Sequence, residues 1–99
     1  MFNSTDMIYK DYNWEAKADY DNPKTISSND FTELNRTEGN EVIYYIRSLA
    51  KSWNWKDDAI KSCQKIEKTI RTKVPEDIKT YGQIKHWIEV NFKSFWDSL

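Results

Sequence analysis

The chain offers few side chains that could carry out chemistry. His86 is the only histidine, and imidazole is the side chain most often used as a general base. On a predicted helix it falls roughly opposite Ile84, which predicts a solvent-exposed side chain rather than a catalytic one. The sequence contains no glycine-rich phosphate loop, no H-x-x-x-H zinc pair and no G-x-S-x-G nucleophile motif. We therefore expect no catalytic residue and a protein that is not an enzyme.

Carboxylates and the single cysteine give little support for a metal or cofactor site. Glu38 and Glu41 are one helical turn apart and could share a cation, but this spacing is common on any charged helix. Cys63 has no second cysteine with which to form a disulfide or a thiolate metal site. The sequence therefore predicts no metal and no cofactor.

Basic side chains do follow a helical spacing. Four of them are expected on one face of a helix, and an aromatic residue with two more cations lies on the helix before it. Such a surface could neutralise phosphates and stack a nucleobase. These candidate nucleic-acid contacts are Lys61, Lys65, Lys68 and Arg71, together with Tyr44, Arg47 and Lys51. The net charge of −1 weighs against this function, so a small nucleic-acid-binding regulator is the alternative to the function proposed below.

Aromatic residues are more numerous than a small helical core requires. The chain has five Trp, six Tyr and four Phe, and aromatic side chains dominate the hot spots of protein interfaces. Tyr9, Tyr12, Trp14 and Tyr20 lie in a segment without an assured intramolecular partner, so they are the candidate interface residues. The alternative is that this segment folds back and its rings complete the helical core. We expect a non-enzymatic interaction module that binds an unknown protein or a second copy of itself.

Charge is distributed unevenly along the chain. Residues 1–45 hold 4 basic and 9 acidic side chains, whereas residues 46–99 hold 11 basic and 7 acidic ones. An acidic first half and a basic second half are consistent with self-association, with complementarity inside one molecule or with a polyanionic partner.

Hydrophobic spacing predicts three helices near residues 38–53, 55–73 and 80–96. On the first, Val42, Ile46, Leu49 and Trp53 follow helical spacing. On the second, the apolar residues Ala59, Cys63, Ile66 and Ile70 lie within one narrow arc. On the third, the predicted inner face consists of Ile84, Trp87, Ile88, Phe92 and Phe95, with Trp96 at its border.

Capping residues set the expected helix ends. Asn35, Thr37 or Asn40 could begin the first helix, and Asn54 is expected to cap the second, with Asp57 and Asp58 in its first turn. Pro75 should end the second helix, because proline lacks the N–H group that continuation requires. Thr80 with Gln83 is typical of a capping box at the start of the third helix.

Residues 1–35 are expected to form an extended aromatic N-terminal arm and a loop ahead of the three-helix domain of residues 36–99. Tyr12, Trp14, Ala16, Ala18 and Tyr20 alternate with polar residues, which is the period of a strand. A short strand here would pair with residues near 24–32 or with a second copy of the chain, or the segment would lie across the helices. The predicted fold class is mainly α, in one small domain.

The sequence contains no stretch of about 20 apolar residues that could span a bilayer. Its N-terminus also lacks a basic region followed by an apolar run. We therefore expect no membrane partner and a cytoplasmic location.

Several short segments also resemble a group of short bacterial proteins of about this length that have no established activity. The segments are Leu34-Asn35-Arg36, Glu38-Gly39, Glu41-Val42, Lys65-Ile66-Glu67, Ile70-Arg71, Pro75 and Trp87-Ile88. The resemblance covers most of the chain and implies a free-standing bacterial protein, but it transfers no functional residue.

Overall fold

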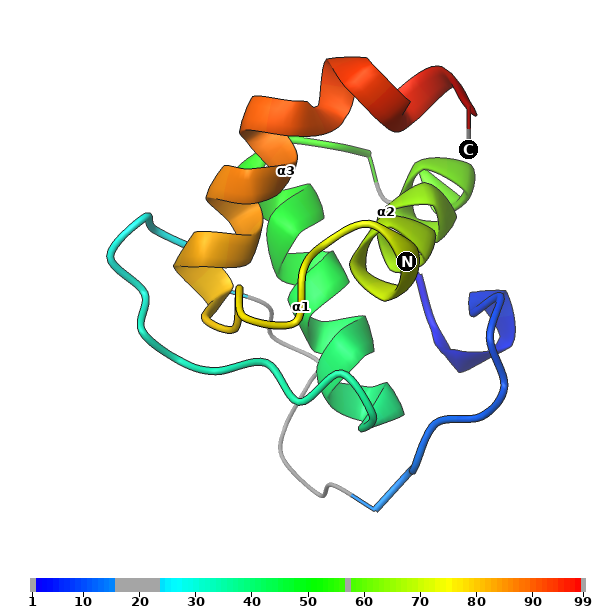
Figure 1. Cartoon of the computed structure of the whole chain (residues 1–99). Helices are drawn as coiled ribbons and strands as arrows, with labels where there is room; N and C mark the ends of the chain where they lie inside the picture. The colour runs from blue at the N-terminus through cyan, green and yellow to red at the C-terminus, as the bar shows by residue number, and fades with distance from the viewer. Residues whose placement is uncertain (1, 16–23, 57, 99) are drawn as a thin grey trace.

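Three α-helices are the main secondary-structure elements of the chain. The computed structural model describes residues 2–15, 24–56 and 58–98. They form α1 (Gly39–Ser52), α2 (Ile60–Thr72) and α3 (Tyr81–Phe95), with short 3-10 turns at Ser4–Asp6 and Trp96–Ser98. In the view of Figure 1, α2 and α3 lie on either side of α1. In the described residues, β-structure is limited to isolated bridges, with no strand. The predicted mainly α fold with three helices is confirmed.

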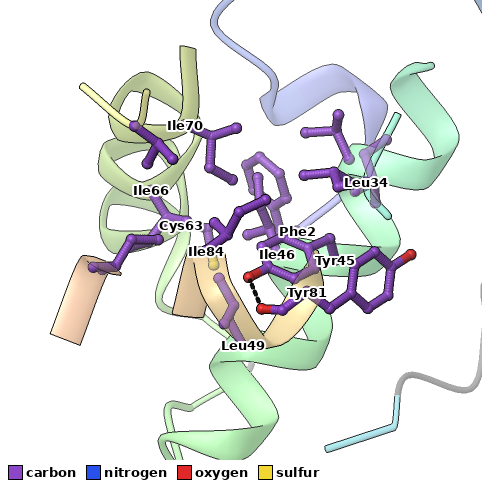
Figure 2. Close-up of a cluster of buried hydrophobic side chains, with 14 of the residues drawn as sticks. Phe2, Leu34, Tyr45, Ile46, Leu49, Cys63, Ile66, Ile70, Tyr81 and Ile84 are labelled. Atoms are coloured by element: carbon purple, nitrogen blue, oxygen red, sulfur yellow. Dashed lines mark hydrogen bonds between the residues drawn. The ribbon is translucent and has the colours of Figure 1, made fainter. Parts of the chain in front are cut away.

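The core is built from the apolar faces of all three helices together with the N-terminal segment. Buried residues of α1 and α2 contact Ile84 and Tyr81 of α3, and Phe2 enters the same cluster (Figure 2). Tyr45 is fully buried and its hydroxyl donates a 2.8 Å hydrogen bond to the carbonyl oxygen of Tyr81. The two rings are 4.7 Å apart between centroids. Tyr45 therefore joins α1 to the first residue of α3.

The sequence placed the start of the second helix five residues too early. Asn54 does not cap α2; it has a left-handed φ of 56° and ends α1. Its N–H donates to the carbonyl of Lys51, and the N–H of Trp55 donates to the carbonyl of Ala50. These two bonds satisfy the free carbonyls at the end of α1 in a Schellman motif. The chain then needs residues 53–59 to turn, and α2 begins at Ile60 without a side-chain cap.

The predicted starts of α1 and α3 are confirmed, but the residue that caps α1 is not one of the three expected. Thr80 and Gln83 form the capping box. At α1 the cap is Glu38, whose side chain accepts a hydrogen bond from the N–H of Asn40. Asn35 instead uses its side chain to bind the N–H and hydroxyl of Thr37.

The N-terminal segment lies across the helices. Phe2, Met7 and Tyr12 are buried in the core. Asn13 makes backbone hydrogen bonds with Thr37 and Gly39, which form a single parallel bridge rather than a strand. Ala16, Ala18 and Tyr20 lie outside the described residues. Of the three expected arrangements of the arm, the described part follows the one in which it crosses the helices.

Fewer residues of α3 are buried than the sequence predicts. Ile84, Ile88 and Phe95 are buried and Trp87 is half-buried, but Phe92 is 40% exposed. Phe92 was expected in the core; it lies instead at the rim of a groove described below, because the late start of α2 leaves this end of the bundle incompletely covered. Among the described residues, no helix has the length and apolar character needed to cross a bilayer.

Candidate tryptophan-lined binding groove

An apolar groove opens where α1 ends, α2 begins and the second half of α3 passes. Its volume is about 420 Å³, within the usual range of sites that bind small ligands or inserted side chains. The buried side chains of Ile66 and Ile88 lie among its walls. The remaining lining residues are Trp53, Trp55, Ser62, Glu89, Phe92 and Trp96.

Three tryptophans from different parts of the chain meet here. The Schellman motif at Asn54 holds Trp53 and Trp55 on either side of one turn, with ring centroids 5.2 Å apart. The ring of Trp96, in the turn that follows α3, lies 6.1 Å from that of Trp55. All three side chains are half-buried. Each keeps part of its aromatic surface accessible, which is unfavourable in water unless a ligand covers it.

Glu89 supplies the polar edge of the groove. Its Oε2 accepts hydrogen bonds from the indole Nε1 of Trp53 and from Nζ of Lys85, both at 2.9 Å. Partial burial opposes ionisation of Glu89, but these two hydrogen bonds outweigh it and hold the pKa of the carboxyl below its ordinary value of 4.5. Glu89 is thus a fixed anion, already paired with Lys85, that orients Trp53.

A second cation lies beside the groove. Nζ of Lys65 sits 5.0 Å from the centroid of the Trp96 ring, a cation–π geometry. Glu89 already pairs with Lys85, so Lys65 is a second cation at this edge. The groove is therefore apolar inside, with these three charged side chains at its border.

The Glu89–Trp53 hydrogen bond predicts a pH-dependent signal. The indole N–H resonance of Trp53 should move as Glu89 is protonated, with a midpoint below pH 4.5. Because the folded pKa is lowered, the stabilisation that this bond gives is complete above pH 4.5 and is lost as the pH falls through the folded value. Proton–nitrogen NMR spectra across this range measure it. A midpoint above 4.5, or a Trp53 signal unchanged by Glu89→Gln, would contradict this geometry.

The predicted interface tyrosines are directed into the same molecule. Tyr12 is buried and its hydroxyl donates a 2.8 Å hydrogen bond to Glu67. Burial first, and this bond second, raise the pKa of Tyr12. Tyr9 is half-buried and stacks on the guanidinium of Arg71 at 4.3 Å. Trp14 is 41% exposed and makes an edge contact with the Tyr12 ring, and Tyr20 lies outside the described residues.

Glu67 was not recognised from the sequence. Its carboxylate accepts hydrogen bonds from the backbone N–H groups of Ile8 and Tyr9, at 2.7 and 3.1 Å, and from the hydroxyl of Tyr12. Its spacing from Cys63 and Ile70 places it on the apolar stripe of α2, and a charge on such a stripe could have indicated a buried polar contact. Glu67 thereby fixes the arm to α2.

The candidate nucleic-acid contacts of α1 and α2 have different partners in the structure. Arg71 forms a bidentate ion pair with Asp11, and this bond is the main reason that the pKa of Arg71 is raised. Arg47 donates to the carbonyl of Phe2 at 2.6 Å. Lys61, Lys68 and Lys51 are exposed, Lys65 lies beside Trp96, and Tyr44 packs half-buried against the core.

The remaining candidate catalytic and metal-binding side chains of the described residues do not meet at one site. His86 is exposed, as expected. Cys63 is buried, and burial raises the pKa of its thiol to about 11. Glu38 and Glu41 bind backbone N–H groups, of Glu15 and Asn35 among others. Within the described ranges, no three His, Cys, Asp or Glu side chains are grouped so as to hold a metal ion.

Comparison of the chain with models of protein families, with curated proteins and with solved structures finds no match. The resemblance to short bacterial proteins therefore stays a prediction.

Proposed function

We propose that this protein is a non-enzymatic, cytoplasmic interaction module that binds a protein partner through the tryptophan groove. The observation that carries the proposal is the meeting of Trp53, Trp55 and Trp96 around an apolar floor, with part of each ring accessible. Tryptophan and phenylalanine are enriched at the centres of protein interfaces. A partner would insert an apolar side chain and cover these rings.

The groove is large enough for an aromatic side chain of a partner. At about 420 Å³ it can take one aromatic ring, and burying a ring removes about 150 to 250 Å² of surface from water. Phe92, which is partly exposed at the rim, would be covered at the same time. The pre-formed tryptophan pair limits the entropy that binding must offset.

The five tryptophans allow this proposal to be tested without knowing the partner. Each indole N–H gives its own NMR resonance, and N-acetylphenylalaninamide can serve as the probe of an inserted ring. Titration to about 20 mM, suited to a millimolar dissociation constant, should shift the resonances of Trp53, Trp55 and Trp96. Trp14 and Trp87, which are not among the lining residues, should not respond.

Acetyl-alanine amide is the matched control for this titration, because it carries the same backbone without the ring. No shift of the three groove indoles, or an equal shift of all five, would refute the proposed function.

Nucleic-acid binding is the second candidate function. Lys61, Lys65 and Lys68 share one face of α2, and Lys65 lies beside the Trp96 ring, so a phosphate and a stacked base could be bound together. The Asp11–Arg71 ion pair reduces the available charge. The measurement is binding of a single-stranded oligonucleotide, which should weaken steeply with salt and in the Lys65→Glu, Lys68→Glu variant. An absence of binding at low salt would remove this candidate.

A further inference from the structure

Phe31 is the most exposed of the large apolar side chains in the described residues, at 82%. Its loop is nevertheless well fixed. The carbonyl of Asp30 accepts from the N–H of Gly82 at 3.1 Å, and that of Thr32 accepts from the N–H of Tyr81 at 2.7 Å. Phe31 is thus held between two backbone anchors with its ring in solvent. An exposed ring on an ordered loop is suited to insertion into a partner, because little further ordering is required.

Phe31 is too far away to fill the groove of its own chain. Its loop is anchored at the first two residues of α3, whereas the groove lies along Ile88, Phe92 and Trp96. At a rise of 1.5 Å per residue, these places are about 10 to 20 Å apart along the helix. A phenylalanine from this loop can reach a tryptophan groove only in another molecule.

The distribution of charge favours contact between the Phe31 loop of one molecule and the groove of another. Asp30 and Glu33 flank Phe31 in the acidic first half of the chain. The groove belongs to the basic second half, and Lys65 is the cation at its border that Glu89 does not pair with. Bringing the acidic loop of one copy to this edge of another places opposite charges together.

We propose that copies of this protein associate head to tail, with Phe31 of one copy inserted in the tryptophan groove of the next. This inference rests on the proposed function, in which the groove takes an apolar side chain, and it names the partner as a second copy. Because the two surfaces differ, the contact is heterologous, and it produces a ring or a chain of copies unless two molecules exchange loops reciprocally.

Two surface variants test the two surfaces of the contact one at a time. Phe31→Ser removes the inserted ring and leaves the groove intact, whereas Phe92→Ser alters the groove and leaves Phe31 intact. Each should weaken self-association by about tenfold or more, as measured by sedimentation velocity between about 10 µM and 1 mM. Ile8→Ser and Val90→Ser are matched controls, since both positions are exposed and outside the contact. Near-ultraviolet circular dichroism verifies that all variants remain folded.

Mixing the two variants gives the decisive result. The Phe31→Ser chain still offers a groove and the Phe92→Ser chain still offers a ring in the unaltered loop. A 50:50 mixture should therefore contain more dimer than either variant alone. A synthetic peptide of residues 27–35 should also shift the groove indoles of Phe31→Ser protein, and the same peptide with Phe31→Ala should not.

The proposal is overturned if the wild-type chain is monomeric over the whole concentration range, if Phe31→Ser associates like wild type, or if the mixture behaves like its components. A monomeric wild-type chain whose groove indoles still respond to N-acetylphenylalaninamide would reject self-association and retain the proposed function. Failure of both measurements would reject both.

Discussion

Replacing Glu67 with alanine should lower the free energy of unfolding by about 3 kcal/mol or more. The carboxylate is 1% exposed and accepts hydrogen bonds from two backbone N–H groups and from the Tyr12 hydroxyl. Alanine would leave the Tyr12 hydroxyl without its acceptor in the core and would open a cavity between the arm and α2. Urea denaturation measures the change.

Two further variants identify the cause of this loss. Glu67→Gln keeps the shape and one acceptor oxygen and should lose less stability than Glu67→Ala. Glu76→Ala, at an exposed acidic position, should change stability by less than about 0.5 kcal/mol. Hydrogen exchange should show that Glu67→Ala releases the amides of Ile8 and Tyr9 first. A Glu67→Ala chain as stable as wild type would mean that the arm is not fixed by this carboxylate.

The second large effect is expected at Tyr45. Tyr45→Ala should cost about 3 to 5 kcal/mol, because it removes a fully buried ring from the centre of the core. Its contact with the Tyr81 ring and its hydrogen bond to the Tyr81 carbonyl would be lost together. Thermal or urea unfolding of the purified variant provides the measurement.

The variant Tyr45→Phe distinguishes the contribution of the hydroxyl to stability from that of the ring. It should cost about 1 to 2 kcal/mol, since it leaves one carbonyl oxygen without its side-chain donor. Tyr44→Ala, at the half-buried neighbouring position, should cost less than Tyr45→Ala. Equal losses at the two tyrosines would place the centre of the core elsewhere.

The three helices could be predicted because their apolar residues recur at helical spacing and because Thr80, Gln83 and Pro75 have few alternative roles. Asn54 shows where such reasoning fails. Asparagine can begin a helix with its side chain or end one in the left-handed conformation, and the choice depended on hydrogen bonds back to Ala50 and Lys51. No local pattern distinguishes the two.

The candidate groove could not be predicted, since its tryptophans are brought together only by the fold. Trp53 and Trp96 are far apart in sequence and each was assigned to a helix face or its border. The late start of α2 separated these faces enough to leave an opening between them. The exposure of Phe31 could not be predicted either, because the side chain of a phenylalanine in a loop can be buried or exposed.

We propose that the tryptophan groove is a binding site and that a second copy of the chain fills it. The test is the proton–nitrogen NMR spectrum of a small fixed amount of labelled protein, recorded while unlabelled protein is added to raise the total concentration from about 10 µM to about 1 mM. We predict that the indole resonances of Trp53, Trp55 and Trp96 shift with concentration while those of Trp14 and Trp87 stay in place. Five indole signals that remain unchanged over this range, together with no response to N-acetylphenylalaninamide, would contradict both the binding role of the groove and its occupation by a second copy.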